Sequence, residues 1–216
     1  DHLPDVEPRA LTTPEAVARL PFMDGQTITE QGPRLLGAPL KEIERIRSFP
    51  TSGSSGPPKR VWFTTADLER TVDFFSVGMQ PLVEPGQTVA VMLGGDRPGS
   101  TVDLLRQGLA RIGVHTRYGA PEGEAAHCLV RTPAQMLYLC RKNLCAPPQT
   151  ILLSADYIPP LTVKALREEW GCRVFTHYGL TETCYGLAVQ CAAQDAQHLR
   201  AADFYVEVVH PDTGRS

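Results

Sequence analysis

The sequence predicts an α/β fold in which a mainly parallel sheet is flanked by helices. Short apolar runs rich in β-branched residues alternate along the chain with segments of helical periodicity. Glycine and proline, present 18 and 19 times, fall between these runs and mark loops. This alternation is typical of parallel strands joined by crossover helices. Ligands bind such sheets at the carboxyl ends of the strands, so the loops after the strands are the ones to search.

The elements follow one another regularly after an irregular lead. Residues 1–50 are the least regular part, with a short helix predicted after Thr13 because Pro14 suits the first helical position. Residues 64–67 and 132–135 have the pattern of a capping box. The later helices are predicted at residues 64–79, 100–113, 132–142 and 159–171. The predicted strands are residues 61–63, 88–93, 114–118, 150–153, 172–175 and 204–209.

The composition is that of a globular protein without the charge pattern of a nucleic-acid binder. The chain has 216 residues, of which 42% are hydrophobic, and 21 basic against 24 acidic side chains leave a formal net charge of -3. No cluster of lysine and arginine could neutralise a phosphate backbone. No apolar stretch reaches the roughly 18–20 residues of a membrane-spanning helix. We therefore expect a soluble, cytoplasmic protein with no nucleic-acid or membrane partner.

Residues 51–59 are the first candidate binding segment. They contain four hydroxyl residues and two glycines and end at Lys59, directly before a predicted strand. Glycine lets backbone N–H groups approach phosphate oxygens, hydroxyls donate further hydrogen bonds, and an ammonium group neutralises charge. A flexible Ser/Gly linker is the alternative, but it does not explain a Pro-Pro-Lys end that leads into an apolar strand. The even spacing of Gly53, Gly56 and Lys59 differs from a Walker A loop, which weakens a phosphate-loop NTPase as a third reading.

Residues 177–182 form the second candidate segment, because they follow a predicted strand at its carboxyl end. Tyr178 can stack on a base, Thr181 can bond a phosphate oxygen, and Glu182 can hold a hard cation such as Mg²⁺ through oxygen. Each residue is ordinary alone, since a Tyr-Gly pair can be a simple turn and a surface glutamate is usually just solvated. The two segments together indicate a nucleotide site.

The two segments resemble those of the adenylate-forming enzymes, the AMP-dependent synthetases and ligases that activate a carboxylate as its acyl-AMP. Residues 51–59 are similar to the family's hydroxyl- and glycine-rich ATP loop, with Ser54 and Ser55 where two threonines are more usual. Residues 178–182 match its Tyr-Gly-x-Thr-Glu motif. Similarity to the phenylacetate-CoA ligase-like branch is carried by residues 20–22, 62–69, 97–100, His198 and residues 203–207.

The resemblance implies a role for each matching residue. The implied ATP- or AMP-binding residues are Thr51, Ser52, Gly53, Ser54, Ser55, Gly56, Lys59, Ser154, Ala155, Asp156, Tyr178, Gly179 and Thr181. The glycine-rich loop would hold the β- and γ-phosphates, Tyr178 would flank adenine, and residues 154–156 would line the adenine site. Lys59, Thr181 and Glu182 would serve catalysis, Thr181 at the α-phosphate and Glu182 through Mg²⁺.

The resemblance also implies the reaction and the extent of the domain. We expect an ATP-dependent ligase that converts a small-molecule carboxylic acid, aromatic or small acyl, to its acyl-AMP and then passes the acyl group to a thiol, usually coenzyme A in this family. Residues 51–216 would be the ATP/acyl-adenylate-binding domain. The family pattern continues with a ribose-binding Asp segment and a small C-terminal domain, so we expect a partial large N-terminal domain, a fragment of a larger ligase that can be inactive alone. The alternative is a non-catalytic nucleotide-binding or interaction module. Many such ligases are dimers, which leaves a homodimer open.

The six cysteines are too few for a disulfide scaffold and are interpreted as thiols or metal ligands. In the phenylacetate-CoA ligase-like branch a similar Cys and His resemble half of a zinc site completed by a later Cys-x-Cys pair, which raises Cys191 and His198 as zinc ligands. Zinc prefers four ligands, so these two need Cys184 or His177 to join them. The alternative is a buried thiol and a hydrogen-bonded histidine. Cys140 and Cys145 are predicted to pack in the core.

Overall fold

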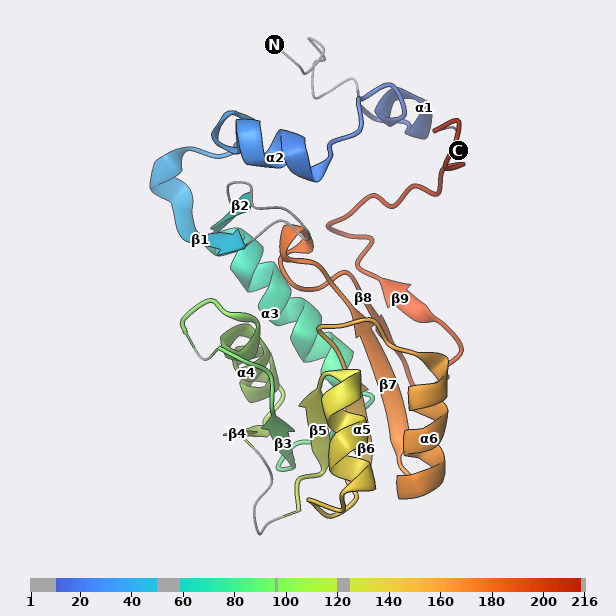
Figure 1. Ribbon diagram of the computed structural model, residues 1–216. Helices are drawn as coiled ribbons and strands as arrows, with labels where there is room; N and C mark the ends of the chain where they lie inside the picture. Colours follow the sequence, from blue (N-terminus) through green and yellow to red (C-terminus); the bar gives the residue numbers. More distant parts are fainter. Residues whose placement is uncertain (1–10, 50–58, 96, 120–124, 215–216) are drawn as a thin grey trace. The chain divides into compact units, whose positions relative to one another are not determined.

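The computed structural model describes residues 11–49, 59–95, 97–119 and 125–214, which divide into two compact units. The larger unit holds residues 40–45 and 63–200, and the smaller unit holds the other described residues. A seven-stranded sheet with the order β4-β3-β5-β6-β7-β8-β9 forms the centre of the larger unit (Figure 1). Within the described ranges, no helix has the length and apolar character needed to cross a membrane.

Five neighbouring strands of this sheet run parallel. They are β3 (Thr88–Val91), β4 (His115–Tyr118), β5 (Cys128–Arg131), β6 (Thr150–Leu153) and β7 (Arg173–Tyr178). The short strands β8 (Ala188–Gln190) and β9 (Gln197–Leu199) continue the sheet in the antiparallel direction. The predicted α/β fold with a mainly parallel sheet is confirmed, although β5, β8 and β9 are absent from the sequence prediction.

Helices cover both faces of the sheet (Figure 1). The helices α5 (Pro133–Arg141) and α6 (Pro160–Trp170) pack on one face, and α3 (Thr65–Met79) and α4 (Thr101–Arg111) pack on the other. The capping box of α3 is confirmed, because Thr64 Oγ1 accepts from the backbone N–H of Asp67 at 3.2 Å and its own N–H donates to the Asp67 carboxylate at 2.9 Å. The capping box at Thr132 is wrong, since its hydroxyl bonds the Gln135 side chain and caps no backbone N–H.

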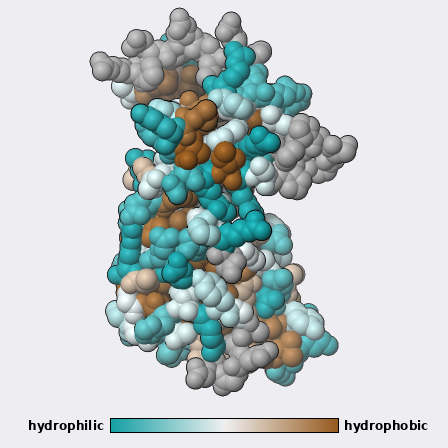
Figure 2. All heavy atoms as spheres, turned by 90° about the vertical axis from the view of Figure 1, so that its left-hand side faces the viewer, coloured by the Kyte–Doolittle hydropathy of each residue, from teal (hydrophilic) through white to brown (hydrophobic). Residues whose placement is uncertain are grey.

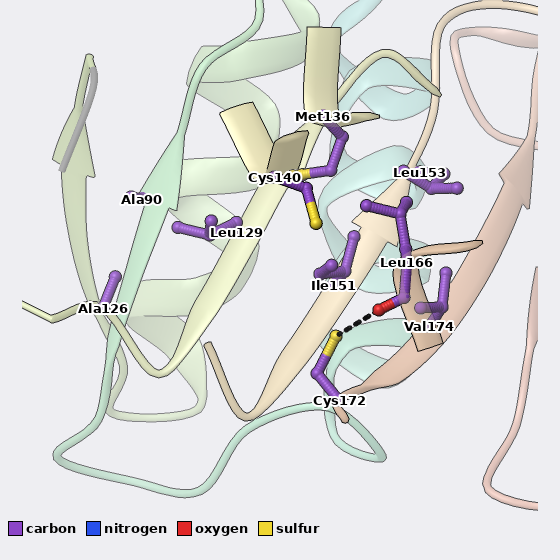
Figure 3. Packing of buried hydrophobic residues seen from close by; sticks show 10 residues of the cluster. All are labelled: Ala90, Ala126, Leu129, Met136, Cys140, Ile151, Leu153, Leu166, Cys172 and Val174. Carbon is purple, nitrogen blue, oxygen red and sulfur yellow. Dashed lines mark hydrogen bonds between the residues drawn. The ribbon is translucent and has the colours of Figure 1, made fainter. Parts of the chain in front are cut away.

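One cluster of the larger unit's core lies between the sheet and the helices α5 and α6. Ten buried residues form this cluster: Ala90, Ala126, Leu129, Met136, Cys140, Ile151, Leu153, Leu166, Cys172 and Val174 (Figure 3). Further buried apolar residues of α3 and α4, among them Val72, Met79 and Leu109, form the core on the other face. Cys140 points from α5 toward Ile151 of β6, and Cys145 packs against the same cluster. Fully burying a Leu, Ile or Met side chain stabilises a fold by about 1.5–3 kcal/mol, so this cluster stabilises the packing of α5 and α6 on the sheet. The predicted core positions of Cys140 and Cys145 are confirmed.

The described residues of the smaller unit include two short α-helices, α1 (Pro14–Val17) and α2 (Gly25–Gln31), and the 3₁₀ helix η2 (Gly32–Leu35). The short helix predicted after Thr13 is confirmed as α1, because the Thr13 hydroxyl accepts from the N–H of Ala16 at 3.3 Å. The 3₁₀ helix η3 (Leu40–Glu42), which belongs to the larger unit, precedes β1 (Ile43–Phe49), and β1 pairs with β2 (Lys59–Thr64) in a two-stranded sheet.

The predicted strand at residues 204–209 is wrong. These residues form no regular element, and no strand of the described ranges pairs with them. Alternating apolar residues favour a strand, but a strand needs a partner edge for its backbone groups. Val208 is largely exposed, so the alternation buries little apolar surface.

On the face drawn in Figure 2, hydrophilic atoms cover much of the described surface and hydrophobic atoms form separate groups.

Candidate functional site

A cavity of about 970 Å³ lies at the carboxyl ends of β6 and β7, within the larger unit. Four segments line it: residues 155–158 after β6, one side of α6, the last residues of β7 with the turn that follows, and the hairpin of β8 and β9. Open α/β sheets bind ligands at this edge, and small-molecule sites usually have volumes of roughly 300–1,000 Å³. The cavity is therefore the first candidate for a binding site.

Residues of the second candidate segment meet residues of the loop after β6 at this cavity. Ala155 and Asp156 line it from the loop after β6, and Tyr178 and Gly179 line it from the end of β7. They converge because β6 and β7 are parallel neighbours, with Leu153 paired to Thr176. Side chains alternate along a strand, so Thr176 and Tyr178 share one face of β7. Tyr178 is 49% exposed, which leaves its ring face open to a ligand.

Ser154 and the cavity-lining His177 join the two strand ends. The Ser154 hydroxyl lies 2.8 Å from His177 Nδ1, and both side chains are buried. The His177 ring packs against Phe74 and Phe75 of α3, with ring centroids 5.9 and 5.8 Å apart. This burial lowers the pKa of His177 from 6.5 to about 4, because removal from water disfavours the charged imidazolium. A neutral imidazole therefore links the two loops at physiological pH.

The residues after Tyr178 form a closed turn, which we call the motif turn and define as residues 179–187. The N–H of Leu187 donates to the carbonyl of Tyr178 at 3.0 Å, and the N–H of Tyr185 donates to that of Leu180 at 2.9 Å. Inside the turn, Thr181 and Glu182 occupy the 3₁₀ helix η4 (Thr181–Thr183) and are half-buried. The turn fixes their backbone relative to Tyr178.

Two glutamine side chains bond the backbone of β7 where β8 no longer pairs with it, at Val174 and Thr176. The strand β8 pairs with β7 only at His177 and Tyr178. Below that point Gln190 Oε1 accepts from the N–H of Thr176 at 2.9 Å, and Gln194 Nε2 donates to the carbonyl of Val174 at 2.6 Å. Both glutamines also line the cavity. Sequence reasoning missed them, because their role depends on a strand pairing that no local pattern reveals.

Charges of both signs lie on the α6 wall of the cavity. Lys164 Nζ lies 3.8 Å from the Glu168 carboxylate, and Arg167 donates to the carbonyl of Val174 at 3.1 Å. All three helix residues line the cavity together with Asp156, whose carboxylate accepts from the N–H of Tyr157 at 2.7 Å. The wall can therefore bond donors and acceptors of a polar ligand. The sequence prediction includes none of the α6 residues.

The other predicted residues lie elsewhere. Residues 51–56 of the glycine-rich loop lie outside the described residues. Lys59 begins β2 in the smaller unit, where its side chain lies beside Gly25. Thr181 and Glu182 belong to the larger unit but do not line the cavity. The structure thus brings together Ala155, Asp156, Tyr178 and Gly179, with Ser154 behind them.

The assignment of Cys191 and His198 as zinc ligands stays a prediction. Cys191 follows β8, and His198 lies on β9 opposite Val189. No group of three or more His, Cys, Asp or Glu side chains in the described ranges is placed to hold a metal ion. Cys184 and His177 are both buried, and His177 Nδ1 is engaged with Ser154. A structural zinc site needs four ligands, so Cys191 and His198 alone do not complete one.

Comparisons with solved structures find the same fold in CoA ligases. An open conformation of 2-hydroxyisobutyryl-CoA ligase with 2-HIB-AMP and CoA has a TM-score of 0.77 at 17% identity, covering 98% of this chain and 55% of that chain. The thioesterification state of that enzyme gives a TM-score of 0.77 at 20% identity, over 97% and 50%. A long-chain-fatty-acid-CoA ligase from Archaeoglobus fulgidus gives 0.54 at 16%, over 70% and 34%.

The chain spans about half the length of the 2-hydroxyisobutyryl-CoA ligase structures that it matches. No model of a known protein family matches the sequence, and no curated protein matches it. At identities of 20% and below, the likeness establishes the fold. The fold matches part of the N-terminal domain of adenylate-forming enzymes, as the sequence predicts.

Proposed function

We propose that the chain is the nucleotide-binding part of an ATP-dependent acid–thiol ligase of the phenylacetate-CoA ligase-like branch. The reaction would join a carboxylic acid to AMP and then transfer the acyl group to a thiol such as coenzyme A. The observation that carries the proposal is a cavity lined by Ala155 and Asp156 from the loop after β6 and by Tyr178 and Gly179 from the second candidate segment. The similar structures of 2-hydroxyisobutyryl-CoA ligase hold 2-HIB-AMP and CoA, which supports this proposal.

The cavity suits the adenosine part of an acyl-AMP. Tyr178 offers a half-exposed ring for stacking on adenine, which typically contributes about 1–3 kcal/mol for a base on an aromatic side chain. Asp156 and residues of the α6 wall supply acceptors and donors for the polar edges of the nucleoside. The Ser154–His177 hydrogen bond holds the two loops at a fixed spacing. These residues bind and orient the nucleotide.

The motif turn and the glycine-rich loop would act on the phosphates. In adenylation a carboxylate oxygen bonds to the α-phosphorus of ATP while the bond to pyrophosphate breaks, so catalysis rests on positioning and charge neutralisation. Thr181 would donate a hydrogen bond to the α-phosphate. Lys59 and the hydroxyls of residues 51–56 would hold the β- and γ-phosphates.

Glu182 fits a magnesium ion that arrives with ATP. Proteins usually bind Mg²⁺ through one or two carboxylates, while substrate phosphates and water supply the other ligands. A single half-buried glutamate in the motif turn meets that requirement. Bound there, Mg²⁺ would neutralise charge that develops on the phosphates.

Exchange of pyrophosphate into ATP tests the proposal over a panel of carboxylic acids. We expect exchange that depends on an acid, lowered at least about 100-fold by Glu182→Gln or Lys59→Ala, because each removes a charge partner of the phosphates or metal. The matched control is Glu84→Gln, an exposed glutamate in the turn after α3, which should retain the wild-type rate.

Three other results would redirect the proposal. AMP binding without exchange for any acid would favour a non-catalytic nucleotide-binding module. Phosphate release from ATP in the absence of an acid would favour an NTPase. Wild-type exchange in both Glu182→Gln and Lys59→Ala would refute the roles given to these residues.

A further inference from the structure

A buried arginine contacts the motif turn from below. Arg200 follows β9 and is 8% exposed. Burial of a guanidinium group is unfavourable unless hydrogen bonds compensate for the lost water. Arg200 Nη1 lies 3.1 Å from the Thr71 hydroxyl on α3 and 3.4 Å from the carbonyl of Gly186 in the motif turn. Its guanidinium carbon lies 5.6 Å from the centroid of the Phe74 ring.

Thr71 extends this contact to the next residues of the turn. Its side chain is fully buried, and its hydroxyl lies 3.0 Å from the carbonyl of Cys184 and 3.2 Å from that of Asp67. The Thr71 oxygen can accept from Arg200 while its hydrogen is donated to Cys184. Gly186 is close to Phe74, since a Cβ at that position would lie 2.6 Å from ring atoms. The carboxyl half of the motif turn is thus held by three side chains.

The backbone of the turn needs such support. Cys184 and Tyr185 have φ values of 47° and 67°, in the left-handed region that non-glycine residues seldom adopt. Two consecutive residues in this region persist only where surrounding contacts determine the conformation. The N–H of Cys184 donates to the carbonyl of Thr181, so a shift at Cys184 would also move η4.

We propose that Arg200 is a positioning residue that, through Thr71 and Gly186, fixes the motif turn and with it Thr181 and Glu182. The inference rests on the proposed function, because it assigns Arg200 an effect on groups that would meet phosphate and metal. Arg200 itself lies outside the set of residues that line the cavity. Its loss should therefore weaken binding of the phosphates and leave binding of the nucleoside nearly unchanged.

The test compares dissociation constants of Mg·ATP and adenosine for the full chain by calorimetry. In Arg200→Met and Thr71→Val we expect the ratio of adenosine Kd to Mg·ATP Kd to fall at least tenfold. Arg200→Lys and Thr71→Ser, which retain a donor, should stay within about threefold of the wild-type ratio. The matched control is Arg173→Met, because Arg173 also donates to a carbonyl, at 3.0 Å, and lies 4.9 Å from a phenyl ring centroid, but at the other end of β7.

The outcomes separate this inference from the proposed function. An unchanged ratio in folded Arg200→Met, or an equal fall in Arg173→Met, would overturn the positioning role while the proposed function stands. If Arg200→Met does not fold, as judged by circular dichroism, the Thr71→Val and Thr71→Ser pair gives the answer. A wild-type chain that binds neither adenosine nor Mg·ATP would refute the proposed function and this inference with it.

Discussion

Gly179→Ala should disrupt the motif turn for steric reasons alone. A Cβ added at Gly179 would lie 2.2 Å from the carbonyl oxygen of Tyr185, 2.7 Å from its carbonyl carbon and 3.0 Å from the nitrogen of Gly186. All three are backbone atoms, and real Cβ atoms essentially never approach closer than 3.0 Å. The turn must therefore open by about 0.8 Å or more, because no flexible side chain can move aside.

The expected cost follows from what this opening breaks. It weakens the hydrogen bonds from Leu187 to Tyr178 and from Tyr185 to Leu180, each contributing about 1 kcal/mol, and adds overpacking of about 1–3 kcal/mol. We expect a loss of roughly 2–4 kcal/mol in the free energy of unfolding. For a chain of this size, that corresponds to a fall in Tm of about 5–15 °C.

Thermal unfolding followed by circular dichroism measures this effect, together with AMP binding. The control is Gly94→Ala, because a Cβ at Gly94 has no neighbour within 4 Å and Gly94 has no left-handed φ. Its Tm should remain within about 2 °C of the wild type. If Gly179→Ala unfolds at the wild-type temperature and binds AMP normally, the steric reasoning is wrong.

Three further predictions concern the larger unit. His177 stays neutral in the folded protein down to about pH 4, whereas in the unfolded chain it takes up a proton below pH 6.5. The free energy of unfolding should therefore keep a contribution of about 3 kcal/mol above pH 6.5 and lose it as the pH falls toward 4. Urea unfolding of His177→Asn should lack this part of the pH dependence, and an unchanged pH profile would contradict the assignment. Leu166→Ala should lower the free energy of unfolding by about 2–5 kcal/mol, because Leu166 is 0% exposed. The control Leu161→Ala, on the same helix but at a site that is 79% exposed, should lower it by less than about 0.5 kcal/mol. Equal losses of the two variants in urea unfolding would argue against the core described above. In the native protein, N-ethylmaleimide should label the half-buried Cys191 well before the buried Cys184, because burial raises the pKa of the Cys184 thiol to about 11. Peptide mass mapping measures the labelling, and equal labelling of the two cysteines would disprove this difference in reactivity.

The parallel part of the fold could be predicted because its strands are buried on both faces. Such strands are continuous apolar runs between turn residues, and the run at residues 150–153 coincides with β6. The strand β5 was harder to identify because its four residues include Cys128 and Arg131 and no run stands out. Its place between β3 and β6 is a tertiary property. The exposed residues 204–209 show the opposite error, in which a favourable local pattern has no partner strand.

The candidate site could be predicted only in part, and the reason is similar. The meeting of Asp156 with Tyr178 follows from the rule that parallel strands present their carboxyl ends at one edge. Arg200 contacts Thr71, which lies 129 positions earlier in the sequence, and Gly186. No sequence pattern predicts these contacts. Whether Lys59 serves the same nucleotide as Glu182 stays a prediction.

The glutamines at the edge of β7 also affect how molecules of this protein behave toward one another. A strand that ends a pairing early leaves N–H and C=O groups that can recruit a strand from a second molecule and start aggregation. Here the amides of Gln190 and Gln194 already occupy those groups at Thr176 and Val174. The solubility of the protein at high concentration should thus depend on the uncharged side chains of Gln190 and Gln194.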